Sequence, residues 1–263
     1  MTIDTILADQ QLIENLKSLV IQAGNAIVDI YESDDFDTSL KGDNSPLTKA
    51  DLTAHHILVE GLKGLTPYLP IISEEDSDTL SISQQYDTYW LIDPLDGTKE
   101  FINKSNEFTV NLALIHHKNT AYGFVGVPAL NTLYWGGKGH GAFKTNTPLE
   151  CNTKEKIQVS DPQSTLRVFA SKSHLNAETE AFIESLGSEV QLVQAGSSLK
   201  FLRIAEGLAD LYPRLAPTCE WDTAAAQAVL EGAGGTVSQP DNSPVVYGKA
   251  EILNPHFIAK GKV

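Results

Sequence analysis

Cysteine is scarce in this sequence, with Cys151 and Cys219 the only two among 263 residues. They lie far apart and show no paired spacing, which argues against a disulfide framework and against a thiolate zinc site. We therefore expect two reduced, ordinary cysteines of the kind found in cytosolic proteins.

Basic residues are also few. The chain has 19 lysines and arginines against 34 aspartates and glutamates, which gives a formal net charge of -15. Binding to a nucleic acid polymer depends on basic side chains that neutralise phosphates, so this class of partner is excluded. A small phosphorylated substrate stays open, because a local cation or basic pocket can overcome the repulsion of the average surface field.

A long apolar run is missing as well. The longest stretch without charge, residues 119–137, contains Pro128, Asn131 and several glycines, so it does not predict a spanning helix. The segment Met1–Asp4 carries an acid where a signal peptide would carry positive charge. We therefore expect a cytoplasmic protein with no integral membrane segment.

The first half of the chain contains helical and then strand-like apolar patterns. Apolar residues at helical spacing predict one long amphipathic helix over residues 6–30. A second helix runs from Thr48 to about residue 65 and opens with a capping box formed by Thr48 and Asp51. Short apolar runs between residues 71 and 135 predict strands, which should form an antiparallel sheet from residue 108 onward.

The second half has a different order of predicted elements. After an expected loop over residues 145–161, strands and helices alternate from residue 166 as in α/β units. This change predicts two halves in contact, an N-terminal α+β half over residues 1–150 and a C-terminal α/β half over residues 151–263.

The most informative segment, Trp90–Phe101, reads WLIDPLDGTKEF. A buried strand would deliver Asp93 at its end, where the following proline favours a turn and Gly97 can supply a positive φ. Asp93 and Asp96 could then direct their carboxylates to a common centre, together with the carbonyl of Leu95. Oxygen-only ligands suit a hard cation such as Mg²⁺. The alternative is a turn acid and a helix cap without any metal.

Two further acidic positions support the metal interpretation. Glu74 and Glu75 directly follow an apolar strand, and clustered carboxylates repel one another unless solvent or a cation compensates. Asp222 stands at the start of a predicted helix. The alternatives are a solvated loop for the glutamates and a simple N-cap for Asp222. The residues alone do not choose between Glu74 and Glu75.

These motifs together resemble the inositol monophosphatase superfamily, which comprises Mg²⁺-dependent, lithium-sensitive phosphatases. The residues that carry the resemblance are Glu74–Glu75, Asp93–Thr98 and Trp221–Asp222, in this order, and the likeness covers almost the whole chain. It implies a layered αβαβα fold, with the N-terminal α+β half and the C-terminal α/β half packed together.

The resemblance, applied residue by residue, implies a centre of two Mg²⁺ ions, with a third ion open. Glu74, Asp93 and the carbonyl of Leu95 would hold the first ion. Asp93 would bridge to a second ion, which Asp96 and Asp222 would also hold. Such a centre neutralises a phosphate monoester and lowers the pKa of the attacking water.

Further catalytic roles follow from the same resemblance. Thr98 would orient the attacking water, with Asp51 as the base or as a ligand of a third ion, and Glu75 would lie beside the ligands. The N–H groups of Gly97 and Thr98 can bind phosphate oxygens at a helix N-terminus. The sequence has no G-x-S-x-G elbow, in agreement with direct attack by water.

The residues expected to bind the substrate lie mostly in the second half of the chain. Lys99–Phe101, Gly196–Phe201 and Leu211–Arg214 look like the CysQ branch, the 3'(2'),5'-bisphosphate nucleotidases. Arginine suits a bidentate phosphate contact and lysine a point-charge contact. Taken singly, each of these cations would more often be an ordinary surface residue, and their grouping within the resembling segments favours the functional interpretation. The implied substrate contacts are His174, Ser197, Lys200 and Arg214, with Glu74, Leu95, Asp96, Gly97, Thr98 and Asp222 at the scissile phosphate.

The predicted reaction is hydrolysis of the 3'-phosphate of adenosine 3',5'-bisphosphate to AMP and phosphate, a clearance step linked to sulfate assimilation. The alternatives are an inositol monophosphatase or a sugar bisphosphatase with the same metal centre, and a non-catalytic protein that binds nucleotide or metal. The branch includes members that associate peripherally with the inner membrane, although no basic amphipathic helix favours this here. The oligomeric state is left open by the sequence.

Overall fold

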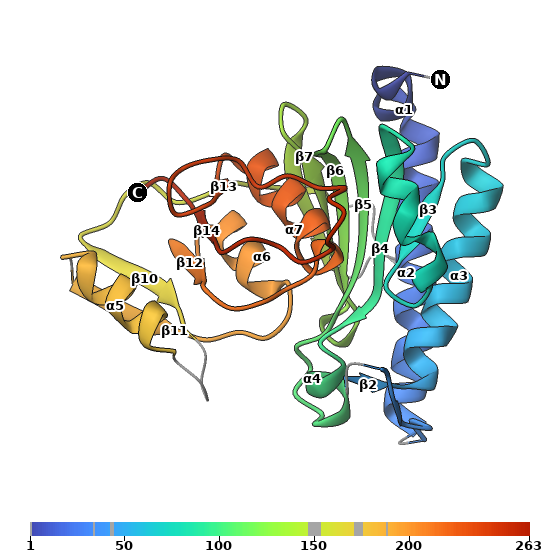
Figure 1. Cartoon of the computed structure of the whole chain (residues 1–263), viewed down its shortest axis with the longest axis horizontal. Coiled ribbons are helices and arrows are strands. Elements are labelled where there is room, and N and C mark those ends of the chain that lie inside the picture. Colours follow the sequence, from blue (N-terminus) through green and yellow to red (C-terminus); the bar gives the residue numbers. More distant parts are fainter. Residues whose placement is uncertain (1, 34, 43–44, 147–153, 171–175, 188) are drawn as a thin grey trace.

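Helices and sheets alternate in five layers across the long axis of the molecule (Figure 1). The computed structural model describes residues 2–33, 35–42, 45–146, 154–170, 176–187 and 189–263. The candidate substrate residue His174 lies outside the described residues, and so does the expected boundary near residue 150. The division into halves at that boundary therefore stays a prediction.

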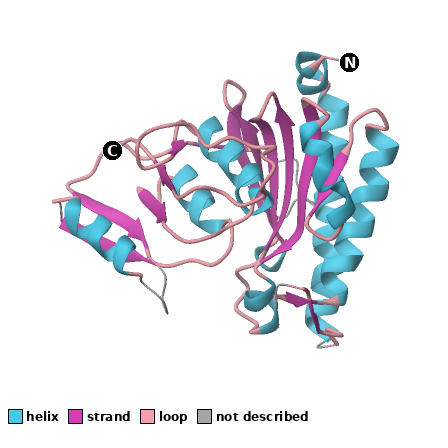
Figure 2. Cartoon of the chain, in the orientation of Figure 1, coloured by secondary structure: helices cyan, strands magenta, loops and turns pink. Residues whose placement is uncertain are grey.

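The layer order is N-terminal helices, seven-stranded sheet, inner helices, five-stranded sheet and outer helix (Figure 2). This arrangement confirms the expected αβαβα fold. Within the part of the chain that is described, no helix has both the length and the apolarity needed to cross a membrane.

The first layer consists of N-terminal helices. The predicted helix over residues 6–30 is in fact two helices, α1 (Ile3–Ala8) and α2 (Gln10–Ser33), because the chain is extended at Asp9. The Asp9 carboxylate accepts a hydrogen bond from the backbone N–H of Leu12 at 3.0 Å, so it starts the second helix as a cap. Apolar periodicity alone does not reveal such a break. The following helix, α3 (Lys49–Leu65), begins at the expected Thr48 capping box.

The second layer is the larger sheet, with strand order β3-β4-β5-β6-β7-β8-β9. Its first pair is parallel and all other pairs are antiparallel. The region over 145–161, expected as a loop, contains the end of β8 and all of β9, whose short and largely exposed sequence lacks an apolar run. The strands are β3 (Ile71–Ser73), β4 (Thr88–Asp96), β5 (Thr109–His116), β6 (Asn119–Val127), β7 (Thr132–Gly137), β8 (Gly141–Asn146) and β9 (Glu155–Ile157).

The remaining layers come from the second half of the chain. The smaller sheet has the order β11-β10-β12-β14-β13, with parallel pairing around β10 and antiparallel pairing around β14, so it is mixed. Its strands are β10 (Thr165–Phe169), β11 (Glu189–Val193), β12 (Leu211–Arg214), β13 (Thr236–Ser238) and β14 (Phe257–Lys260). The helices are α5 (Ala177–Ser185), α6 (Leu199–Ala205) and α7 (Glu220–Gly232).

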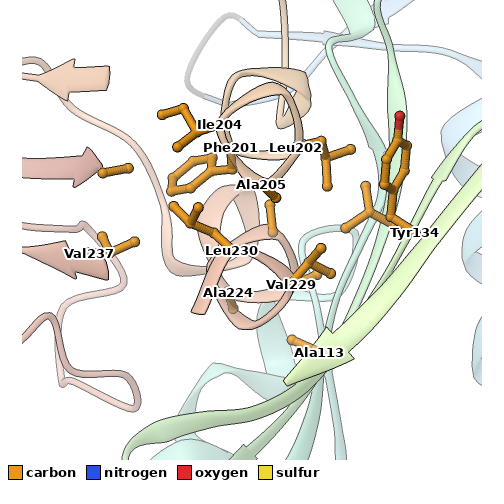
Figure 3. Packing of buried hydrophobic residues seen from close by; sticks show 14 of the residues in the cluster. Ala113, Tyr134, Phe201, Leu202, Ile204, Ala205, Ala224, Val229, Leu230 and Val237 are labelled. Atoms are coloured by element: carbon orange, nitrogen blue, oxygen red, sulfur yellow. The ribbon is translucent and has the colours of Figure 1, made fainter. Parts of the chain in front are cut away.

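Helix α7 lies between the two sheets and fixes their distance. Its alanine-rich sequence lets it be buried on every side, and residues 223–230 are all buried. Figure 3 shows Ala224, Val229 and Leu230 of this helix packed beside residues of α6. A Cβ at Gly123 of β6 would lie 2.1 Å from the carbonyl oxygen of Ala225, so only glycine permits this approach. The packing places the N-terminus of α7 against the larger sheet.

Candidate active site

Three carboxylates meet where β3, β4 and α7 come together. The side chains of Glu74, Asp93 and Asp222, named here the carboxylate trio, each offer an oxygen within 4.8 Å of the others. The parallel β3–β4 pair brings Glu74 next to Asp93, since the Glu74 N–H donates to the carbonyl of Ile92 at 3.2 Å. Asp222 accepts a hydrogen bond from the Cys219 N–H at 2.8 Å, which fixes it at the start of α7.

The electrostatics of the trio are unfavourable for bare carboxylates. Asp93 has only 1% of its surface exposed, and burial, Glu74, Asp96 and Asp222 together raise its pKa well above the ordinary value. Burial, with Asp96 and Glu74 adding, raises the pKa of Asp222 to about 8 despite the hydrogen bond from Cys219. Crowded, dehydrated carboxylates of this kind need protons or a cation. An all-oxygen donor set of high charge fits Mg²⁺.

The strand that carries Asp93 continues further than expected. Instead of turning at Asp93, β4 runs to Asp96, and its pairing with β5 shifts by one residue between these two positions. Such a bulge re-aims side chains without ending the strand. The expected positive φ of Gly97 is confirmed at 91°, directly before the short helix α4 (Thr98–Ile102).

Asp96 is held by residues from distant parts of the chain. Its Oδ2 atom accepts hydrogen bonds from the Ser197 hydroxyl at 2.6 Å, the Ser198 N–H at 2.7 Å and the Ser198 hydroxyl at 3.0 Å. Thr109 of β5 adds a fourth donor at 3.3 Å. The hydroxyl of Ser197, expected to contact substrate, is thus used to orient a predicted metal ligand.

Asp51 and Thr98 also come together as expected. The Thr98 hydroxyl lies 3.2 Å from Asp51 Oδ1 and 3.3 Å from the Leu95 carbonyl oxygen. The other oxygen of Asp51 accepts from the N–H and hydroxyl of Thr48, at 2.8 and 2.6 Å. Asp51 therefore caps α3 and reaches Thr98 at the same time, one oxygen for each task. Burial raises the pKa of Asp51, although the bonds from Thr48 oppose this shift.

The structure distinguishes the two neighbouring glutamates. Glu74 joins the trio, whereas the Glu75 side chain is 4% exposed and pairs with Lys41 at 2.6 Å. Lys41 also contacts Glu74 at 2.7 Å. Burial lowers the pKa of Lys41, but both glutamates outweigh it and raise the pKa overall. No motif or periodicity in the sequence marks this lysine, so its role was missed.

A cavity of about 410 Å³ reaches Gly196, the residue directly before Ser197, and is named here the Lys200 cavity. It is lined by both predicted cations, Lys200 and Arg214, and by Glu100 and Glu107 from the first half of the chain. Lys200 donates to the carbonyl of Ser197 at 3.1 Å, so the cavity and Asp96 share one turn. Arg214, another lining residue, donates from its guanidinium group to the backbone carbonyls of residues 216 and 217.

One buried polar atom beside this site has no partner among the described residues. The side-chain oxygen of Asn111 makes no hydrogen bond, while its amide nitrogen donates to the Ser198 hydroxyl at 3.1 Å. Asn111 lies opposite Asp93 in the β4–β5 ladder. A buried acceptor of this kind requires water or another ligand, which fits a hydrated cation nearby. Asn111 could not be recognised from sequence, because its role depends on cross-strand pairing.

The chain matches known proteins along nearly its whole length. Residues 8–262 match the model of the inositol monophosphatase family. The 3'(2'),5'-bisphosphate nucleotidase CysQ of Escherichia coli (strain K12) is 44% identical over 248 residues, which cover 94% of this chain and 98% of that relative. The CysQ nucleotidase of Haemophilus influenzae is 31% identical, with 96% and 94% covered.

Solved structures show the same likeness. A crystal structure of CysQ from Bacteroides thetaiotaomicron aligns with a TM-score of 0.84 at 38% identity and covers 98% of this chain and 99% of that one. The extragenic suppressor protein suhB from Bartonella henselae shares the fold, with a TM-score of 0.77, 21% identity, and 96% and 94% covered. With the carboxylate trio in place and the match running from residue 8 to residue 262, the chain belongs to the inositol monophosphatase family.

Proposed function

We propose that the chain is a Mg²⁺-dependent phosphatase that hydrolyses the 3'-phosphate of adenosine 3',5'-bisphosphate to AMP and phosphate. One observation carries the proposal: Asp96, a further predicted metal ligand, and the Lys200 cavity are joined by a single turn. Ser197 contacts Asp96 at 2.6 Å through its hydroxyl and Lys200 at 3.1 Å through its carbonyl. A substrate with two phosphates could place one phosphate at each end. The CysQ names of the full-length relatives support this choice.

At the carboxylate end, two Mg²⁺ ions are proposed, with room for a third left open. Glu74, Asp93 and the Leu95 carbonyl would hold the first, and Asp93, Asp96 and Asp222 the second. Bound there, Mg²⁺ would neutralise the scissile phosphate, lower the pKa of water and stabilise the leaving oxygen. The crowding that raises the pKa of Asp93 and Asp222 supports this assignment, because a cation would relieve it.

Proton handling is assigned to Asp51 and Thr98. The Thr98 hydroxyl donates to Asp51 Oδ1 at 3.2 Å, so a water that donates to Thr98 could pass its proton toward a carboxylate. Because burial raises the pKa of Asp51, this carboxylate is a better proton acceptor than an exposed aspartate. The Thr48 capping bonds keep it in place during this exchange.

The second phosphate is assigned to the Lys200 cavity. Lys200 supplies a point charge and Arg214 a planar fork, the two complementary ways in which proteins bind phosphate. Inositol 1-phosphate has no second phosphate and would leave both cations unused. The cavity thus favours a bisphosphate, while the carboxylate end would treat every scissile phosphate alike.

The proposal is tested by phosphate release with and without Mg²⁺. We expect kcat/KM for adenosine 3',5'-bisphosphate to exceed the values for inositol 1-phosphate and fructose 1,6-bisphosphate, with no release after chelation. A preference for inositol 1-phosphate or the sugar bisphosphate would overturn the substrate but keep the phosphatase. No release from any of the three would favour a binding protein without turnover.

We also propose a cytoplasmic location, with peripheral association at the inner membrane as the alternative. The net charge of -15 opposes attraction to anionic lipids and supports the first choice. Fractionation at physiological salt should leave the protein in the supernatant. Recovery mainly in washed membranes would contradict this.

A further inference from the structure

The turn over residues 196–198, between β11 and α6, has a special backbone. Ser197 has a φ of 49°, in the left-handed region that residues with a side chain rarely adopt. Gly196 is tightly enclosed, because a Cβ there would lie 3.0 Å from both Glu100 Cγ and Glu107 Cβ. Such a conformation persists only when its surroundings hold it.

Glu107 fixes the first residue of this turn through a hydrogen bond. Its Oε2 atom accepts a hydrogen bond from the Gly196 N–H at 2.9 Å, across 89 positions of sequence. Glu107 is half-buried, precedes β5, and lines the Lys200 cavity. Glu107 therefore lines the cavity while one oxygen of its carboxylate is bonded to the turn.

The residues of this turn contact Glu107, Asp96 and Lys200. Gly196 is bound by Glu107, and Ser197 and Ser198 donate to Asp96 Oδ2. The carbonyl of Ser197 accepts a hydrogen bond from the Lys200 ammonium group. A displacement of Gly196 would therefore move an Asp96 donor and a Lys200 acceptor together.

We propose that Glu107 is a positioning residue, which sets the turn and thereby places Lys200 in the cavity and Asp96 at the carboxylate site. The inference rests on the proposed function, because it takes the cavity as the substrate end and Asp96 as a metal ligand. Glu107 holds Gly196 because its side chain is long enough to reach the N–H and its oxygen accepts the hydrogen bond. Its negative charge is not required for this. That distinction can be tested, since glutamine keeps the reach and aspartate keeps the charge.

The experiment compares Glu107→Gln with Glu107→Asp, and Glu184→Gln on the exposed face of α5 serves as the matched control. Glutamine can still accept from Gly196, whereas aspartate is one methylene too short. For Glu107→Asp we expect KM for adenosine 3',5'-bisphosphate to rise about fivefold or more, as for a lost hydrogen bond. Glu184→Gln should stay within about twofold of the unmodified chain, whereas Glu107→Gln should keep or lower KM, because it retains the hydrogen-bond acceptor and removes a negative charge from the lining of the cavity.

A second readout uses Mn²⁺ in place of Mg²⁺ and no substrate. Because the turn also holds Asp96, Glu107→Asp should weaken Mn²⁺ binding, measured by electron paramagnetic resonance, while Glu107→Gln should not. A stability defect alone would lower the melting temperature without moving the Mn²⁺ dissociation constant of the folded protein. This readout decides the role of Glu107 even if adenosine 3',5'-bisphosphate proves not to be the substrate.

Three results would overturn the proposal. Loss in Glu107→Gln with retention in Glu107→Asp would indicate direct contact of the charge with a ligand. Equal loss in both would mean that the intact carboxylate itself is needed, and unchanged KM and Mn²⁺ affinity in both would mean that Glu107 positions nothing. Failure of the unmodified chain to hydrolyse the bisphosphate concerns the proposed function only.

Discussion

Asp93 and Asp210 are almost equally buried, with 1% and 2% of their surface exposed, but their surroundings are opposite. Asp93 is surrounded by Glu74, Asp96 and Asp222, and its pKa is raised well above the ordinary value. Asp210 contacts Arg167 through side-chain bonds at 2.6 and 2.9 Å. Burial raises the pKa of Asp210, but the bonds from Arg167 outweigh this and lower it overall.

The comparison teaches that burial does not separate a structural acid from a functional one. The chain supplies the counter-charge of Asp210 from its own sequence, and this pair ties the β10 strand to the segment before β12. At Asp93 the nearest groups are further carboxylates, so the counter-charge has to come from outside. The predictions that follow change one of these acids or the positive charge that balances it.

The largest effect is expected from Asp93→Asn. Losing a bridging ligand should lower kcat/KM by about a thousandfold or more, since a catalytic cation contributes several kcal/mol. The metal-free variant should unfold at the same or a higher temperature than the unmodified chain, because one repelling charge is gone. Kinetics and thermal unfolding in the presence of a chelator measure the two effects. Retained Mg²⁺-dependent turnover would contradict the metal assignment.

At Asp210, which is paired with Arg167, the substitution Arg167→Met should lower the free energy of unfolding. It leaves Asp210 buried without its cation, which costs about 3–5 kcal/mol of unfolding free energy. The exposed pair of Lys262 and Asp161 provides the control, and Lys262→Met should cost less than about 1 kcal/mol. Urea unfolding gives both values. A similar cost for the two variants would show that burial of the pair is unimportant.

Metal removal should distinguish the two acids without any mutation. A ligand that binds only the folded chain adds about 2.7 kcal/mol at a hundredfold excess over its dissociation constant. Mg²⁺ should therefore raise the melting temperature of the unmodified chain and of Arg167→Met, but not that of Asp93→Asn. Equal stabilisation of all three would place the cation somewhere other than the carboxylate trio.

Arg214 is an intermediate case. It lines the Lys200 cavity, and its positive charge also offsets part of the rise in the pKa of Asp222. Arg214→Ala should raise KM for adenosine 3',5'-bisphosphate about tenfold, the cost of a lost charge-assisted contact. KM for inositol 1-phosphate should change much less. Equal changes for both substrates would remove Arg214 from recognition of the second phosphate.

The smallest effect concerns pH. The lowered pKa of Asp210 gives stability that is present above the unfolded value of about 3.9 and lost as pH falls through the folded pKa. The gap in unfolding free energy between the unmodified chain and Arg167→Met should therefore be largest near neutral pH and shrink below about pH 4. Urea unfolding across that range measures it. A gap that does not depend on pH would mean that the pair contributes through packing alone.

Much of the site could be predicted because its key contacts are local. The Thr48–Asp51 capping box, the positive φ of Gly97 and the place of Asp222 at a helix start all depend on residues within a few positions. The five-layer fold followed from the change of rhythm along the chain and from the family resemblance. The break at Asp9 and the continuation of β4 to residue 96 were missed, because apolar patterns do not encode caps and bulges.

The order of residues is enough to say which acids are available and which helices and strands present them, since backbone geometry and capping bonds act over three or four residues. The residue pattern alone did not choose between Glu74 and Glu75, and the family resemblance implied Glu74. The packed structure brings Glu74 to Asp93 and Asp222 and pairs Lys41 with both glutamates, which no local pattern indicated. The bond from Glu107 to Gly196 spans 89 positions of sequence. Contacts over such distances depend on how α7 packs between the sheets, and packing is a property of all the layers at once.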